Sequence, residues 1–118
     1  MAENKTVTPI TLTDDKNGDV FVLEFDRAAV RFAEGRGFKL DILDGSVSLS
    51  AIEDLFFYAF RMHQPKISKA ETDKILYEKL GGLSDGMLER LVELYLQPFN
   101  TLLQSDDETK NSTMTVKF

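Results

Sequence analysis

The sequence predicts an α+β fold: an N-terminal β-hairpin followed by a small bundle of about four helices. Two short runs of alternating apolar residues flank an Asn-Gly pair near the N-terminus, which is typical of a hairpin. Four later apolar segments each begin just after a serine or an aspartate, the side chains that cap helix N-termini. The last residues, 113–118 (TMTVKF), alternate again and indicate an additional C-terminal strand.

The predicted hairpin consists of strands over residues 10–13 and 20–25. If Asn17 and Gly18 form a two-residue type I′ turn, Lys16 lies opposite Asp19. Counting outward places the apolar side chains on one face, in the cross-strand pairs Leu12 with Leu23 and Ile10 with Phe25. Two strands alone are only marginally stable in water, so we expect helices to cover this face.

Capping side chains mark the start of each predicted helix. Asp26 and Ser84 are expected as N-caps, whereas Ser50 and Ser68 are each followed three residues later by glutamate, the capping-box pattern. The helices are expected from about Arg27 to Arg36, from Ser50 to about His63, from Ser68 to Gly81 and from Ser84 to about Gln104.

Glycine and proline mark the predicted helix ends. Gly37 and the pair Gly81-Gly82 favour the left-handed backbone that closes a helix, and Pro65 stops the second helix. Pro98 should interrupt or bend the last one, because proline lacks the backbone N–H that a helix interior uses.

Composition narrows the class of protein. With 118 residues, of which 42% are hydrophobic, the chain suits a single α+β domain over 1–105 with a polar C-terminal tail over 106–118. The net charge of −6 disfavours a general nucleic-acid binder. The longest apolar run, Leu55–Phe60, is too short to span a membrane, so we expect a soluble cytosolic protein.

No pattern in the sequence indicates a metal or a cofactor. Cysteine is absent and His63 is the only histidine, so cysteine-zinc sites and histidine clusters are excluded. The acidic segment 14–19 resembles a calcium loop, but Thr13 stands where the first ligand is needed and strands flank it, which favours a plain turn. The glycines at 35 and 37 close a helix rather than open one, unlike a phosphate-binding loop.

Catalysis is the weaker hypothesis. His63 falls on the apolar arc of its predicted helix, and no nucleophile or orienting carboxylate is evident from the sequence. We therefore expect an interior or helix-end histidine and a protein that is not an enzyme. Neither a cofactor nor a metal is expected.

Aromatic and apolar residues outside the main arcs are the candidate partner contacts. Phe57 lies opposite the apolar arc of its helix and Tyr58 borders the same polar strip. The apolar residues of the last helix span about half of its circumference, which suggests two contact surfaces. The alternative is that this helix is the centre of the bundle and that Phe57 is covered by the chain itself. The candidates are Phe57, Tyr58, Leu96, Phe99 and Leu103.

Short motifs over residues 20–103 resemble a family of small proteins from the tail-gene region of siphophages that infect Gram-positive hosts. The resemblance rests on the motif Glu34, Gly37 and Phe38, on the run Phe57-Tyr58-Ala59-Phe60 with His63 and Pro65, and on Leu91, Glu93, Leu94, Tyr95 and Pro98. The N-terminal hairpin and the C-terminal STMTVKF lie outside the resemblance.

The resemblance implies a tail assembly chaperone. Such proteins coat the tape measure protein, keep its helices soluble and help recruit tail tube subunits, without being retained in the mature virion. It implies a homo-oligomer in the host cytoplasm whose partners are the tape measure and tail tube proteins. Two other classes stay open: a structural tail or connector subunit, and a small regulatory adaptor whose acidic surface mimics nucleic acid.

Overall fold

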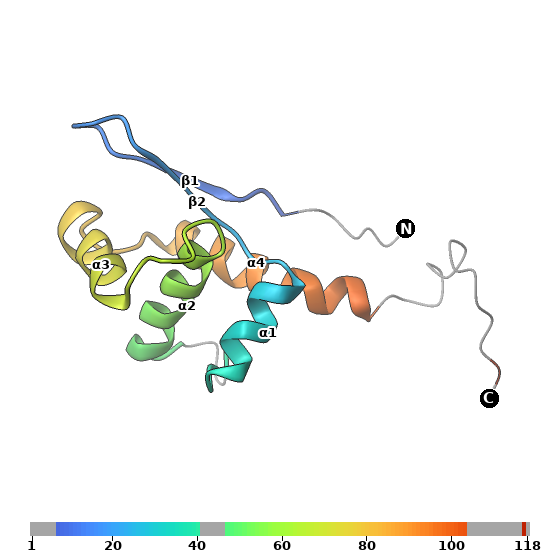
Figure 1. Ribbon diagram of the computed structural model, residues 1–118. Coiled ribbons are helices and arrows are strands. Elements are labelled where there is room, and N and C mark those ends of the chain that lie inside the picture. The colour runs from blue at the N-terminus through green and yellow to red at the C-terminus, as the bar shows by residue number, and fades with distance from the viewer. Residues whose placement is uncertain (1–6, 41–46, 104–116, 118) are drawn as a thin grey trace.

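A computed structural model describes residues 7–40, 47–103 and 117, and within them the predicted α+β order is confirmed (Figure 1). A two-stranded antiparallel hairpin precedes the helices. The C-terminal strand predicted over 113–118 lies, apart from Lys117, outside the described residues. The elements are β1 (Ile10–Thr13), β2 (Val20–Leu23), α1 (Arg27–Gly35), α2 (Leu49–Arg61), α3 (Lys69–Lys74), η2 (Ile75–Lys79) and α4 (Asp85–Leu102).

The hairpin register differs from the predicted one by two residues. Leu12 lies opposite Phe21, and Ile10 lies opposite Leu23. The predicted type I′ turn at Asn17-Gly18 is therefore wrong, as are the pairs of Leu12 with Leu23 and of Ile10 with Phe25. Because side chains alternate between the two faces, a slip of two residues leaves the same set on the core face, and the hydrophobic pattern could not separate the two registers.

A longer loop sets this register. The N–H of Asp14 donates to the carbonyl of Asp19 (2.7 Å), and the N–H of Gly18 donates to the carbonyl of Asp14 (2.7 Å). Inside the loop, the carboxylate of Asp14 accepts from the N–H of Lys16, and the amide oxygen of Asn17 accepts from the N–H of Asp19. Gly18 has φ +79°, which glycine adopts without a steric penalty. Asp, Asn and Gly thus stabilise a wider turn than the Asn-Gly pair alone predicts.

Helix α1 begins and ends where the sequence predicts. The Asp26 carboxylate accepts from the N–H of Ala29 (2.7 Å). At the other end the N–H of Phe38 donates to the carbonyl of Ala33 (3.0 Å), with Gly37 at φ +91°. This closure turns the chain so that Phe38 enters the core, where it is buried.

Helix α2 begins two residues earlier than predicted. Ser48, not Ser50, is its N-cap, and its hydroxyl accepts from the N–H of Ala51 (3.1 Å). The predicted capping box of Ser50 with Glu53 is therefore wrong. The Glu53 carboxylate instead accepts a hydrogen bond from the hydroxyl of Tyr77 on η2, so a neighbouring helix uses the group that the local pattern assigned to the cap.

The later helix ends agree with the prediction. Ser68 and Glu71 form both hydrogen bonds of a capping box, and Ser84 caps α4 by accepting from the N–H of Met87 (3.2 Å). A five-residue π-helical turn, η2, continues α3 up to the glycine pair. Pro98 lies inside α4 but does not interrupt it, because α4 continues to Leu102.

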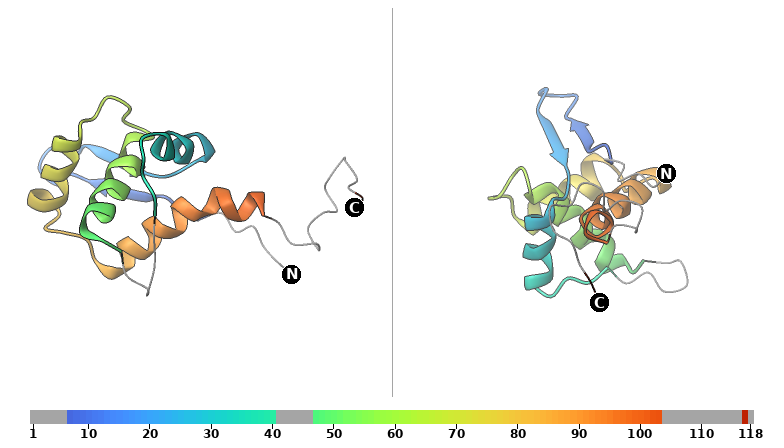
Figure 2. Two further views of the ribbon diagram at one scale, coloured as in Figure 1. Left: turned by 90° about the horizontal axis from the view of Figure 1, so that it is seen from below. Right: turned by 90° about the vertical axis from the view of Figure 1, so that its right-hand side faces the viewer.

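Helix α2 is the centre of the molecule and contacts α1, α3, α4 and β2. Three views show these helices gathered around it, with the hairpin packed along one side of them (Figures 1 and 2). The N–H of Glu24 donates to the carbonyl of Ala59 (3.1 Å), which joins the end of β2 to the last turn of α2. The fully buried large side chains are Phe56, Phe60, Leu23, Leu55, Leu91, Leu94 and Thr72. Within the described ranges no helix is long and apolar enough to cross a membrane.

Candidate partner-binding surface

The structure separates the five predicted contact residues into two groups. Leu96 and Leu103 are exposed on the C-terminal half of α4 (36% and 76%), and Phe99 lies partly buried between them. Phe57 is partly buried against the core. Tyr58 is buried, at 9% exposure. Tyr58 is therefore covered by the chain itself in the described structure, and its predicted role as a partner contact stays a prediction.

Tyr58 is buried because two other elements cover α2 at this position. The rings of Phe32, from α1, and Phe38, from the segment after α1, pack against it at centroid distances of 6.1 and 5.5 Å. Phe57 packs against Tyr58 from the same helix, at 5.0 Å. Phe57 and Tyr58 are thus covered by other parts of the chain. The sequence left this alternative open for Phe57, which the helical period places outside the main apolar arc.

The C-terminal half of α4 is the apolar surface that the described chain leaves open. Residues 94–103 (LYLQPFNTLL) contain no charged side chain. Leu94 and Tyr95 are buried, whereas Leu96, Leu102 and Leu103 are exposed. Figure 1 and the left view of Figure 2 show this end of α4 extending past the other helices. One side of α4 therefore completes the core and the other faces away from it.

A groove runs between α1 and this half of α4, and we call it the α1/α4 groove. On one side of Phe99 its apolar wall consists of Val30, Pro98 and Leu102. On the other side of Phe99 a second hollow is lined by apolar side chains that include Phe38, Leu40, Tyr95 and Leu96. Phe99 and Glu34 line both hollows, so the two are neighbours.

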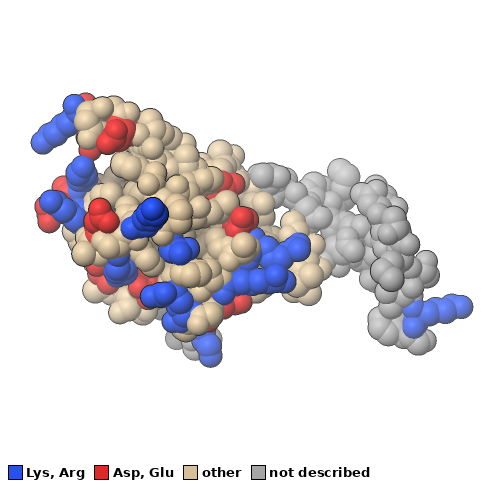
Figure 3. Space-filling model, in the orientation of Figure 1, with Lys and Arg blue, Asp and Glu red and all other residues tan. Residues whose placement is uncertain are grey.

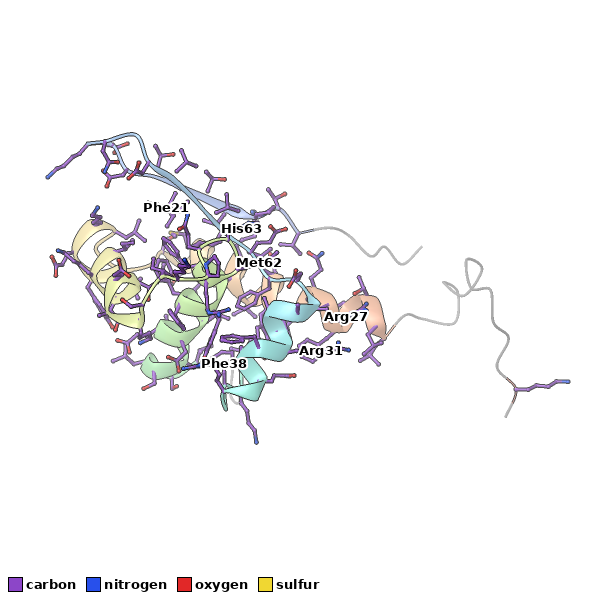
Figure 4. The ribbon with its side chains drawn as sticks, viewed as in Figure 1. Phe21, Arg27, Arg31, Phe38, Met62 and His63 are labelled. Carbon is purple, nitrogen blue, oxygen red and sulfur yellow. The ribbon has the colours of Figure 1, made fainter. Side chains whose placement is uncertain are left out.

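The rim of the groove is basic where α1 begins. Arg27 and Arg31 line the groove together with Phe99 and Leu102. They are one helical turn apart on α1, and Figure 4 shows both where α1 meets α4. Lys and Arg side chains gather on this face of the molecule (Figure 3). The sequence alone does not connect these arginines with an apolar surface, because Phe99 and Leu102 lie on α4, far along the chain.

The floor of the groove is rigid aromatic packing. Tyr95 contacts the rings of Phe25, Phe38 and Phe99 at centroid distances of 5.1, 5.4 and 5.7 Å. Burial, assisted by the negative charge of Glu34, raises the pKa of Tyr95 to about 12. The raised pKa extends the range over which its hydroxyl stays neutral to strongly alkaline pH.

A separate hollow, outside the α1/α4 groove, lies between the hairpin and η2. Its apolar side chains are Leu12, Phe21, Ile75 and Leu80. Lys79 and Asp14 also line it, and Lys79 Nζ forms an ion pair with Asp14 Oδ2 (2.8 Å). Asp14, the first residue of the acidic segment 14–19, is thus paired with a lysine. The described residues include no group of three His, Cys, Asp or Glu side chains placed to hold a metal.

His63 lines neither the α1/α4 groove nor the hollow between the hairpin and η2. Helix α2 ends at Arg61, and His63 follows in the next turn with its side chain 42% exposed. Its expected place at a helix end is confirmed, whereas an interior position is wrong. Its Nε2 lies 2.8 Å from Glu24 Oε1, so the pair joins the residue after β2 to the turn after α2. We assign this pair a structural role.

Comparison with known proteins identifies a family but not an activity. The domain of unknown function (DUF5055) matches residues 1–118, the whole of the chain. No curated protein and no solved structure matches.

Proposed function

The chain belongs to the DUF5055 family, whose function is unknown, and from this premise we propose that it is a phage tail assembly chaperone. In this role it is not an enzyme. It binds the tape measure protein, keeps that protein soluble and helps to recruit tail tube subunits. The observation that carries the proposal is the open apolar half of α4, with the α1/α4 groove beside it.

The groove suits a helical client. Neighbouring apolar side chains left exposed on a small domain mark an interaction site, and a groove between two helices accepts the apolar stripe of a third. Leu102 and Leu103 extend that surface to the end of α4. Before assembly, the apolar faces of a long protein with amphipathic helices must be covered to keep the protein soluble. The proposed chaperone covers them. The motifs of the resemblance support the same reading.

The chaperone role implies an oligomeric state and a location for the protein. A chaperone that lines a long client acts as many copies side by side, so we propose a homo-oligomer in the host cytoplasm that is absent from the mature virion. A structural tail or connector subunit would instead be found in purified particles. Detecting the chain in virions by mass spectrometry at a stoichiometry comparable to that of tail subunits would overturn this part of the proposal.

The deciding experiment is co-expression with a long helical phage tail protein of the tape measure type. Size-exclusion chromatography with light scattering should show a soluble complex, and the long protein expressed alone should precipitate. The change Leu102→Asp should weaken the complex because it places a charge on the apolar wall of the groove. Leu102 is 69% exposed, so the fold should persist.

Leu49→Asp is the matched control. Leu49 is 67% exposed, as Leu102 is, but it lies at the start of α2 and lines neither half of the groove. It should leave the complex intact. If the wild-type chain stays monomeric and does not bind the long protein, the proposal is wrong. If the two substitutions weaken the complex equally, the groove is not the binding site.

A further inference from the structure

In the half of the α1/α4 groove that ends at Leu102, the charged side chains come from α1. The facing half of α4, residues 94–103, is uncharged. Arg27 and Arg31 line the half of the groove that ends at Leu102, and Glu34 lies at the junction with the other half. Although the chain carries a net charge of −6, this half of the groove combines an apolar wall with two cations. The local charge is thus opposite in sign to the net charge of the chain.

The two arginines are placed for carboxylates. Among the described ion pairs none involves Arg27 or Arg31, and both are exposed. Residues four apart are separated by about 6 Å along a helix, so Arg27 and Arg31 lie one turn apart along α1 on the side that lines the groove. Guanidinium groups bind carboxylates in a planar, two-bonded geometry.

A partner that covers the apolar wall also removes water from the arginines beside it. A desolvated guanidinium group without a counter-charge is unfavourable, and a cation placed opposite it is worse. The partner that fits best therefore carries acidic side chains next to its apolar stripe.

We propose that the α1/α4 groove binds an amphipathic helix whose apolar stripe is flanked by acidic side chains spaced three or four residues apart, opposite Arg27 and Arg31. The proposal rests on the chaperone function and names the chemistry of its client segment. A helix of this kind offers leucine-type side chains to Phe99 and Leu102 and carboxylates to the arginines.

Two fluorescently labelled helical peptides test this with the full chain. Both carry the same leucine stripe, but one has glutamate and the other lysine at the flanking positions. Fluorescence anisotropy should show at least about tenfold tighter binding of the glutamate peptide at low salt. The preference should shrink as salt rises, because the contacts are at the rim.

Charge reversal at the rim provides the specific readout. The double change Arg27→Glu and Arg31→Glu should reverse the preference in favour of the lysine peptide. Lys66→Glu with Lys74→Glu is the control, because it alters the net charge equally at exposed positions that do not line the groove. This control should retain the preference for glutamate. Circular dichroism on each variant confirms that the fold is kept.

The outcomes separate this inference from the function beneath it. If both peptides bind equally, or if the control loses the preference as the rim variant does, the inference is wrong while the chaperone proposal stands. If neither peptide binds and the long tail protein is not bound either, the chaperone proposal fails with it. If neither peptide binds and rim reversal instead abolishes self-association, the occupant is a second copy and the inference is overturned.

Discussion

Tyr95 is the residue that links the α1/α4 groove to the core. Its ring contacts Phe25 and Phe38 on the core side and Phe99 on the groove side. The pairs with Phe25 and Phe38 are edge-to-face, and such aromatic pairs add specific geometry to the burial of large apolar surfaces. The shape of the groove floor therefore depends on the order of the core.

Tyr95 should ionise late in an alkaline titration, because its pKa is raised to about 12. The pKa of Tyr95 is raised above the ordinary 10.0 in the folded chain, so folding favours its neutral form. That contribution to stability is complete below pH 10 and is lost as the pH rises to about 12. An ultraviolet titration of tyrosinate absorbance should show a late step that disappears in Tyr95→Phe.

Tyr77→Phe is the comparison for that titration. The pKa of Tyr77 is also raised, chiefly by its hydrogen bond to Glu53, but Tyr77 is half-exposed. If Tyr77→Phe removes the late step and Tyr95→Phe does not, the burial of Tyr95 has been misassigned.

At the scale of the elements, α2 depends on how it begins. Its N-cap follows directly on the segment that brings the chain from α1, and its last turn receives the N–H of Glu24. Both ends are thus held by hydrogen bonds from outside the regular helix. Since α2 contacts α1, α3, α4 and β2, a change at its first turn reaches the whole core.

Ser48→Ala should cost about 0.5–2 kcal/mol of unfolding free energy, because it removes the side-chain acceptor for the N–H of Ala51. Urea denaturation followed by circular dichroism measures it. Ser50→Ala is the matched control and should stay within about 0.5 kcal/mol of the wild type, because Ser50 lies exposed inside the first turn. If Ser50→Ala lowers the unfolding free energy more than Ser48→Ala does, then Ser50 is the N-cap of α2, as the sequence alone predicts.

At the scale of the whole molecule, one ion pair connects the hairpin tip to the helical bundle. Lys79 lies at the end of η2, and its ammonium is 2.8 Å from the carboxylate of Asp14. Other contacts hold the opposite end of the hairpin: Gln97 accepts from the N–H of Val7, and Arg90 donates to the carbonyl of Thr8. The hairpin is thus attached to the bundle at both ends, over the hollow between them.

Lys79→Met should raise the pKa of Asp14. The hydrogen bond from Lys79, together with that from the N–H of Lys16, lowers the pKa of Asp14 below its ordinary 3.8. A depressed carboxyl pKa contributes stability above 3.8 that is lost as the pH falls through the lower value in the folded chain. Carbon-13 NMR of the Asp14 carboxyl during an acid titration measures the change.

Lys16→Met tests whether charge alone explains that shift. It removes a neighbouring ammonium but keeps the backbone N–H that donates to Asp14. The Asp14 pKa should therefore move less than in Lys79→Met. Equal shifts in the two variants would mean that the hairpin tip is not attached through Lys79.

The order of the elements could be predicted because the signals behind it are local. The caps at Asp26, Ser68 and Ser84 and the closure at Gly37 involve hydrogen bonds between residues a few positions apart. Each such bond forms within its own segment, whatever the rest of the chain does. The α+β arrangement follows from these boundaries together with the apolar periods.

The misplaced features involve alternatives that the local pattern leaves equal. Ser48 and Ser50 are both suitable N-cap residues. In the structure Ser48 is the cap, and Glu53 accepts a hydrogen bond from Tyr77 of another helix. Two hairpin registers put the same side chains on the core face, and the loop from Asp14 to Asp19 selected one of them. Nothing within these segments ranks the alternatives.

The sequence by itself determined the class of fold and the helix starts at Asp26, Ser68 and Ser84. It also determined that the apolar side chains of the last helix span about half of its circumference. Only the tertiary structure decided that Tyr58 is buried under Phe32 and Phe38 and that Arg27 and Arg31 border Phe99. The reason is that burial and grooves arise from packing between helices distant along the chain. Side-chain period defines one face of each helix, but which helix meets that face depends on the whole core.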